Sequence, residues 1–157
     1  MPKIFKATIN APIIFAKGLS GQTADLQQWQ TSAGVILGSV TAGGVQTATQ
    51  PTPSAQNASV TLTIANLLTG IITTTSTVGV TLTLPTGTLS DGGFVSLSSD
   101  LSFDWSIINT GSSAGSISIA GGTGHTYVGN ATISLGTSAR FRSRRSSANT
   151  WVTYRIS

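Results

Sequence analysis

Apolar and polar residues alternate one by one through most of the second half of the chain. The alternation is clearest in two segments, SVTLTI at 59–64 and VGVTLTL at 78–84. Shorter runs follow, with the sequences FVSL, FDWSII, SISIA, ATISL, ARFRSRR and WVTYRI. Alternation over about 4–8 residues, interrupted by Gly, Ser and Asn, is typical of β-strands joined by turns. Residues 59–157 are therefore predicted to form a β-sandwich/jelly-roll-like domain, with one helical turn in ANLLTG that ends at Gly70.

The part of the chain before Ser59 lacks this continuous pattern. Residues 1–23 show no clear period and contain several Pro and Gly residues, so we expect an extended N-terminal arm. In residues 24–46 the turn signal Ser-Ala-Gly separates QQWQ from VILGSV, which predicts a small hairpin. Residues 47–58 are rich in Pro, Thr and Ser and are expected to be a linker. The expected fold class is thus all-β: an extended arm and a small hairpin followed by the C-terminal domain.

The predicted hairpin has too few apolar residues to build its own core. Trp29, Val35, Leu37 and Val40 lie among Gln, Thr, Ser and Gly. An isolated hairpin is marginally stable in water, and so short a segment cannot bury enough apolar surface alone. We expect these side chains to pack against something outside the segment. The candidates are the C-terminal domain of the same chain, another copy of the chain, or the surface of a larger assembly.

The composition favours a protein that works as part of a larger assembly. Only 8% of the 157 residues are charged, against about 25% in an average soluble domain. So neutral a surface does little to keep copies apart, and it suits a protein packed against copies of itself. Cysteine is absent, which excludes disulfides, thiolate metal sites and thiol catalysis. The apolar run APIIFA is too short to span a bilayer or to act as a signal peptide, so we expect neither a membrane partner nor Sec export.

The sequence offers weak candidates for enzymatic chemistry. GSSAG at 111–115 fits the nucleophile elbow, but a strand-like run follows it and no Asp comes after Ser113, so a turn is expected. Asp100 and Asp104 would be about 13 Å apart on one strand, outside the range of about 5–9.5 Å of glycosidase pairs, and we expect solvated or Arg-paired carboxylates. His125, the single histidine, is expected in a loop and cannot form a zinc site alone. We expect no enzyme activity, no metal and no cofactor.

The basic residues lie near the two ends of the chain. The C-terminal cluster RFRSRR contains Arg140, Arg142, Arg144 and Arg145. Three interpretations stay open for it: a solvated strand, pairing with an acidic protein partner or neighbouring subunit, and phosphate binding. Because only Phe141 interleaves with the arginines, nucleic acid is not the expected partner.

Two parts of the chain resemble bacteriophage structural proteins. The first comprises Ala24-Asp25-Leu26, Trp29-Gln30, Ser32, Gly34, Leu37, Ser39-Val40 and Gly43, which resemble short units from the trimeric shafts of phage fibre proteins. The second resembles a C-terminal β domain of small phage virion proteins. It is carried by ANLLTGIITTT, VTLTLPTG, FDWSIINTG, IAGGTG, VGNATI, ARFR and WVTYRI. The resemblance implies a short virion component, because the chain has only one shaft-like unit.

The resemblance also implies partners and roles. It implies a homotrimer in which Leu26, Trp29, Val35, Leu37 and Val40 meet near a threefold axis. It implies a cement or head-fibre protein on the outer capsid surface that binds the major capsid protein. The candidate attachment residues are Lys3, Ile4, Phe5, Lys6, Ile13, Ile14, Phe15 and Lys17. One alternative is a tail fibre or tail tip that binds a host glycan through His125 and Tyr127; a weaker one is a small serine esterase.

Overall fold

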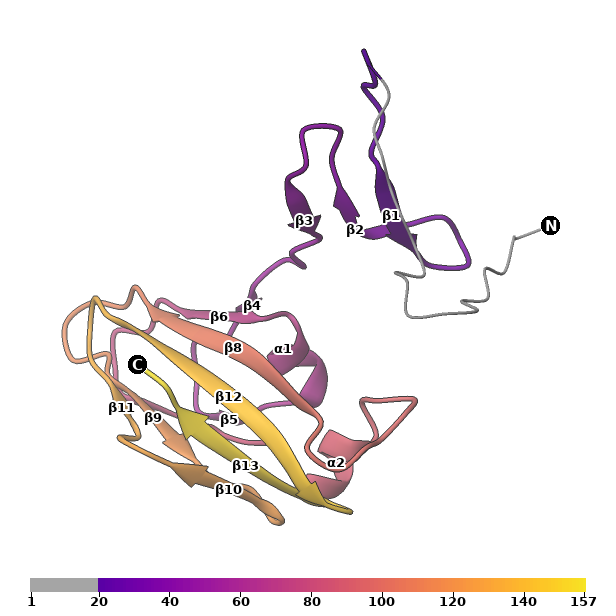
Figure 1. Cartoon of the computed structure of the whole chain (residues 1–157). Helices are drawn as coiled ribbons and strands as arrows, with labels where there is room; N and C mark the ends of the chain where they lie inside the picture. The colour runs from indigo at the N-terminus through magenta and orange to yellow at the C-terminus, as the bar shows by residue number, and fades with distance from the viewer. Residues whose placement is uncertain (1–19) are drawn as a thin grey trace. The chain divides into compact units, whose positions relative to one another are not determined.

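The computed structural model describes residues 20–157, so the eight attachment candidates lie outside the described residues. The chain divides into two compact units, Met1–Thr49 and Gln50–Ser157, which are treated separately below (Figure 1). The described residues form mostly β-strands, with two five-residue helices. The β-rich class expected from the sequence is therefore confirmed.

The N-terminal unit contains a three-stranded antiparallel sheet. Its strands are β1 (Gln27–Gln30), β2 (Ile36–Val40) and β3 (Gln46–Ala48), in the order β1-β2-β3. The first two strands form the predicted hairpin. β3 was not predicted, since it lies mostly within the segment expected to be a linker.

Two turns of the same construction connect these three strands. In the first, Thr31 N donates to Val35 O and Gly34 N donates to Thr31 O, at 2.9 and 3.0 Å. In the second, Thr41, Gly44 and Val45 make the same two bonds, both at 2.9 Å. Gly34 and Gly44 have φ values of +80° and +81°, which a side chain would strain. The sequence Thr-x-x-Gly-Val, present at 31–35 and 41–45, thus encodes both turns.

The C-terminal unit is built on two sheets. The six-stranded sheet has the order β10 (His125–Val128), β13 (Thr150–Arg155), β12 (Ser138–Ser147), β8 (Ser102–Asn109), β6 (Ile71–Thr74) and β4 (Ser54–Ala55). The four-stranded sheet has the order β11 (Thr132–Ile133), β9 (Ile117–Ala120), β7 (Val80–Thr83) and β5 (Val60–Thr61). From β4 to β11, the chain passes from one sheet to the other at every step.

This alternation makes much of the strand pairing parallel. β4 pairs with β6, β6 with β8, β5 with β7 and β7 with β9, all in parallel. Parallel neighbours need a crossover connection, and here each crossover contains a strand of the other sheet together with one short helix. Sandwiches and jelly rolls are mainly antiparallel, so the winding differs from the simple architecture that the sequence predicted.

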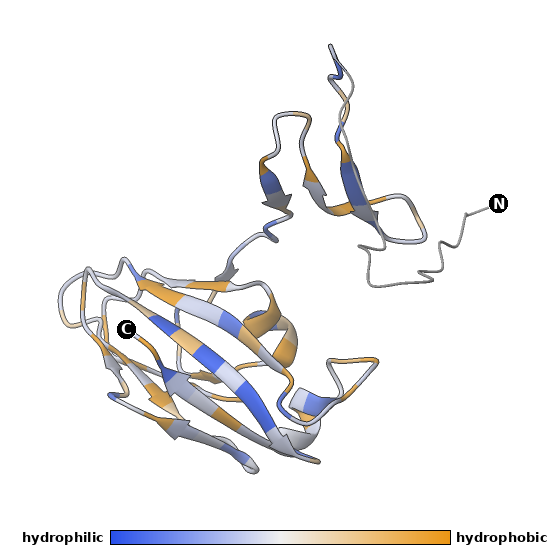
Figure 2. Ribbon diagram, in the orientation of Figure 1, coloured by the Kyte–Doolittle hydropathy of each residue, from blue (hydrophilic) through white to orange (hydrophobic). Residues whose placement is uncertain are grey.

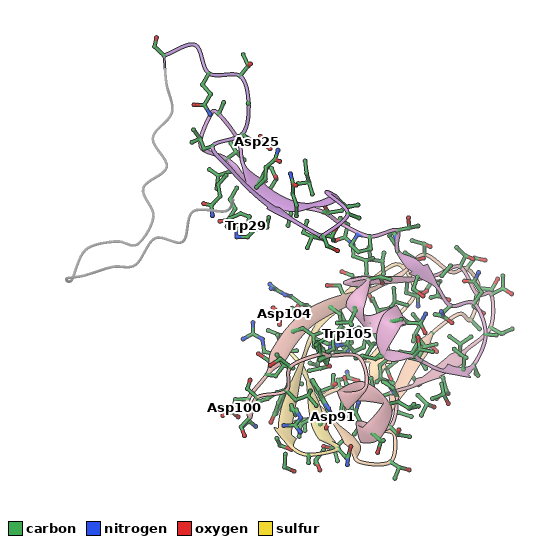
Figure 3. All side chains as sticks on the ribbon, turned by 90° about the vertical axis from the view of Figure 1, so that its right-hand side faces the viewer. Asp25, Trp29, Asp91, Asp100, Asp104 and Trp105 are labelled. Carbon is green, nitrogen blue, oxygen red and sulfur yellow. The ribbon has the colours of Figure 1, made fainter. Side chains whose placement is uncertain are left out.

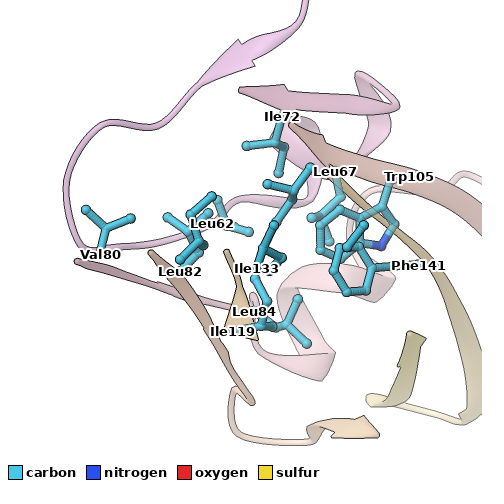
Figure 4. Packing of buried hydrophobic residues seen from close by; sticks show 13 residues of the cluster. Leu62, Leu67, Ile72, Val80, Leu82, Leu84, Trp105, Ile119, Ile133 and Phe141 are labelled. Carbon is cyan, nitrogen blue, oxygen red and sulfur yellow. The ribbon is translucent and has the colours of Figure 1, made fainter. Parts of the chain in front are cut away.

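The two sheets share one hydrophobic core. Its side chains come from both sheets, and Trp105 stacks on Phe141 with ring centroids 4.5 Å apart (Figure 4). The predicted alternation is confirmed in β7, where Val80 and Leu82 are buried and Thr81 is exposed. The buried hydrophobic residues of the described chain are Leu62, Leu67, Ile72, Val80, Leu82, Leu84, Trp105, Ile107, Ile117, Ile119, Ile133, Ala139, Phe141 and Trp151.

Two short helices lie beside the sheets. α1 (Ile64–Leu68) is the predicted helical turn: Thr63 and Asn66 form a capping box, and Gly70 follows with φ +77°. α2 (Gly87–Asp91) was not predicted, and Thr86 caps it by accepting a hydrogen bond from Leu89 N. A Cβ on Gly87 would lie 1.8 Å from Asn149 O, so only glycine lets α2 approach the β12–β13 connection so closely. That approach positions Asp91 for the cluster described below.

Candidate interaction surfaces

The shaft-like unit exposes its large apolar side chains. Trp29, Val35 and Leu37 are 45%, 57% and 52% exposed, and Leu26 and Val40 are half-buried. No hydrophobic side chain among residues 20–49 is buried. The five predicted trimer-interface residues are thus exposed or half-buried in the single chain, where a partner could cover them. Figure 2 colours the ribbon by hydropathy and shows hydrophobic and hydrophilic positions mixed along these strands.

The sheet brings only some of these five residues together. Trp29 pairs with Gly38, and its ring carbon Cε3 lies 3.6 Å from where a Cβ on Gly38 would be. A Cβ on Gly38 would be in ordinary contact with the indole but only 2.9 Å from Thr47 O, so glycine here permits the close approach of β3. Val40 pairs with Gln27 and lies on the same face as Trp29, because strand residues two apart share a face. Leu37 is skipped by the register and Val35 lies in the turn, so neither forms a cross-strand pair with β1.

Three of the four predicted partner-binding arginines form one row. Arg140, Arg142 and Arg144 point away from the core on β12, and we call them the arginine ladder. Arg140 Nη2 donates to Asp104 Oδ2 at 2.7 Å, and Arg142 Nε donates to Asp104 Oδ1 at 2.6 Å. Arg144 pairs with Asp100. The expectation of Arg-paired aspartates is confirmed; Figure 3 labels both carboxylates.

The arginine ladder lowers the pKa of Asp104, the carboxylate that Arg140 and Arg142 share. The hydrogen bond from Arg142 lowers the pKa of Asp104 below its usual value, and burial opposes this while Arg140 adds to it. The ladder side chains are 42–59% exposed, so solvent screens these ion pairs strongly. The ladder is therefore a surface feature with donors available to a partner, and it adds little to stability.

Arg145 does not belong to this surface, which corrects the prediction that grouped it with the other three. Successive strand residues point to opposite faces, so Arg145 lies opposite Arg144, on the core side. It donates to both oxygens of Asp91, at 2.9 and 3.1 Å. Asp91 also accepts from Trp151 Nε1 at 2.7 Å and from Asn149 N at 2.9 Å. We call these four residues the Asp91 cluster.

Asp91 is held ionised by this cluster. The Arg145 hydrogen bond lowers its pKa to about 2 against the opposing effect of burial, with help from Asn149 and Trp151. The cluster joins the end of α2 to β12 and β13. Its role is structural, and Arg145 is not available to a partner.

The interpretation of the sequence also misplaced His125. It is the first residue of β10, fully buried, and it cannot line a receptor loop. Tyr127 faces the same way, half-buried against Phe141, and its hydroxyl donates to Asn130 O at 2.6 Å. Alternation along β10 places both side chains toward the interior because they are two residues apart. The predicted pair of receptor-contacting side chains is therefore wrong for His125, and Tyr127 is committed to internal contacts.

The contacts of His125 fix its protonation. Pro85 O, 3.0 Å from Nδ1, can only accept a hydrogen bond, so Nδ1 carries the proton. Nε2 must then accept from Thr153 Oγ1 at 2.8 Å. Thr153 in turn contacts Ser143 Oγ at 2.7 Å, which accepts from Trp105 Nε1 at 2.9 Å. The chain of donors runs one way and leaves no acceptor for a second imidazole proton.

Burial and this arrangement keep His125 neutral. Desolvation lowers its pKa to about 4, although the Pro85 carbonyl favours the charged form. Ser90 Oγ lies 3.3 Å from Nδ1, and it is buried as well. Ser90 and His125 are therefore both inaccessible to solvent, and their contact is part of the packed interior.

The GSSAG segment forms the turn that was expected from its sequence. Ser113 lies in a two-residue turn with φ +61°, and β9 rather than a helix follows it. In the described range 20–157, no group of three His, Asp or Glu side chains is placed to hold a metal. Neither described helix is long and apolar enough to cross a membrane.

Sequence reasoning missed the neighbours that define these surfaces. Tyr154 and Val128 lie on the same side as the ladder, because Tyr154 pairs with both Arg142 and Val128 across the sheet. Alternation along WVTYRI puts Val152, Tyr154 and Ile156 on one face, but the sequence gives no signal that this face also carries the arginines. The Asp91 cluster was missed because Asp91 lies 54 to 60 residues before the other three members.

No protein-family model, curated protein or solved structure matches this chain.

Proposed function

We propose that this protein is a virion structural protein, a homotrimeric cement or head-fibre protein that binds the major capsid protein on the outer capsid surface. The observation that carries the proposal is the exposure of the large apolar side chains in the shaft-like unit, where no hydrophobic residue is buried among residues 20–49. Because this unit resembles phage fibre shafts, which are trimeric, we propose that three copies of the chain cover these side chains in a trimer.

Burial between copies would stabilise a unit that a single chain leaves open. Trp29 is 45% exposed, and covering about 100 Å² of it would contribute about 2.5 kcal/mol per chain. Val35, Leu37 and Val45 would add to this, since they are 52–62% exposed. Contacts of this kind would supply the packing that a small sheet needs for stability.

The C-terminal unit is proposed to be a sandwich of jelly-roll-like type that faces outward. Its two sheets share one core, which supports a sandwich, and its parallel winding sets it apart from antiparallel examples. The basic N-terminal segment is proposed to bind the shell. Bridging neighbouring capsid subunits would resist the internal pressure of packaged DNA, a mechanical role without catalysis.

The test is the mass of the protein in solution. Light scattering should give three times the chain mass of 16.0 kDa. Trp29→Ala should move the mass toward that of one chain. Leu89→Ala is the matched control, because Leu89 is 58% exposed but lies in the C-terminal unit, and it should leave the trimer intact.

A solution mass equal to that of a single chain, measured on the unmodified protein, would refute the trimer. Gold-labelled antibody against the C-terminal unit, applied to intact particles, separates the two virion locations. Label over the head supports the capsid proposal, whereas label confined to the tail supports a tail fibre.

A further inference from the structure

The charges of the C-terminal unit are concentrated on one side of one sheet. Residues 50–157 contain eight charged side chains. Arg145 and Asp91 are internal, and Arg155 bonds the backbone oxygens of Asn130 and Thr132. The other five form the arginine ladder with Asp100 and Asp104. The rest of the unit's surface is therefore almost uncharged, and this one area stands out on it.

Strand register shows what surrounds the ladder. Val128, Tyr154, Arg142 and Asp104 are consecutive cross-strand neighbours over β10, β13, β12 and β8. Directly opposed residues share a face, so this row crosses the side of the sheet that points away from the core. We call that side the outer face. Val128 and Tyr154 are 49% and 36% exposed, so apolar and aromatic surface adjoins the charges.

The outer face keeps positive charge that its aspartates do not neutralise. Three ladder arginines meet two aspartates, which leaves one net positive charge. Arg140 and Arg142 share Asp104, and Arg140 contributes only Nη2 to it. A guanidinium has five N–H donors, so Arg140 can bind a second carboxylate without losing the first.

We propose that the outer face docks a carboxylate-rich surface of another protein. Arg and Tyr are enriched in the cores of protein interfaces, and apolar neighbours such as Val128 would be buried on docking. Nucleic acid fits less well, because protein–nucleic acid interfaces are far more positive than a face with one net positive charge. The inference goes beyond the proposed function, since it requires neither a trimer nor a virion.

The test is an NMR titration of the full ¹⁵N-labelled chain with a hexaglutamate peptide at low salt. Amides of β8, β12 and β13 and the Nε groups of Arg140 and Arg142 should shift. Arg140→Gln with Arg142→Gln should weaken binding at least five-fold. Lys3→Gln with Lys17→Gln removes the same charge from the N-terminal segment and should change it less than two-fold.

A second variant is expected to strengthen peptide binding rather than weaken it. Asp104→Asn removes the internal competitor for Arg140 and should strengthen peptide binding about three-fold, whereas Asp25→Asn, with the same charge change in the other unit, should not. The proposal is overturned if the outer-face resonances do not shift, or if the lysine variant weakens binding as much as the arginine variant. Tighter binding of a short DNA duplex to the same face would overturn it in favour of nucleic acid.

Discussion

Replacing Asp91 by Asn tests whether the Asp91 cluster holds the C-terminal unit together. Asn has the same size, so the change removes the charge and leaves the volume. The side chains of Asp91 and Arg145 are each 11% exposed, and Arg145 would keep its charge without a counter-ion. Breaking one side of a buried ion pair costs about 3–5 kcal/mol. Since the Asn oxygen can still accept from Trp151 Nε1, we expect a cost at the lower end, about 3 kcal/mol.

The measurement is urea unfolding at pH 7, followed by tryptophan fluorescence and by circular dichroism. A loss of about 3 kcal/mol corresponds to a fall in Tm of about 10–20 °C for a domain of this size. Asp104→Asn is the control: its arginine partners are 53–59% exposed, so it should cost less than about 1 kcal/mol. Equal costs for the two variants would refute the argument that burial of the cluster matters.

The same cluster predicts an acid transition with a definite sign. The pKa of Asp91 is about 2 in the fold against 3.8 ordinarily, so the unfolded chain binds the proton first as the pH falls. The resulting stability is fully present above about pH 4 and is lost between about pH 4 and 2. It amounts to about 1–2 kcal/mol after allowance for solvent screening. Asp91→Asn should therefore flatten the stability curve in that range.

Two further predictions concern buried contacts of the C-terminal unit. The pKa of His125 is lowered from 6.5 to about 4, so the free energy of unfolding should fall by about 3 kcal/mol as the pH falls from about 6.5 to 4. His125→Gln should abolish this pH dependence of stability in urea titrations. An unchanged pH dependence in the variant would contradict the assignment to His125. Gly87→Ala should cost at least about 2 kcal/mol, because its Cβ would overlap Asn149 O, whereas Gly79→Ala, with its nearest neighbour at 3.7 Å, should cost less than about 1 kcal/mol in the same assay.

Alternation revealed the strands because it reports burial, but it carries no information on which strand pairs with which. The pattern around β7 gave the correct buried face, yet its parallel pairing with β5 and β9 depends on segments that are distant along the chain. Residues 1–19 of the expected arm lie outside the described residues. The third strand of the N-terminal unit was missed although a signal existed, because the Thr-x-x-Gly-Val turn at 31–35 recurs at 41–45.

The errors at the candidate sites have a common physical cause. Arg144 and Arg145 are adjacent, so the same alternation that aligned the ladder places Arg145 on the core side. The sequence could not show that an interior charge would be tolerated there, because the compensating Asp91 comes from α2. His125 was assigned to a loop because glycines precede it, but its burial depends on Thr153 and Pro85, which distant segments supply.

The two units differ in how far they bury their large side chains, and this contrast is the strongest argument for the proposed assembly. In the C-terminal unit the side chains of His125, Asp91 and Arg145 are buried and bonded, and no buried side-chain nitrogen or oxygen of the described chain lacks a partner. Such satisfied polar networks rigidify a domain that already has a core. The N-terminal sheet has neither a core nor a network of that kind among residues 20–49, and Trp29 stays on its surface. The proposed trimer would account for this contrast, because another copy of the chain would cover the tryptophan that this sheet leaves exposed beside Gly38.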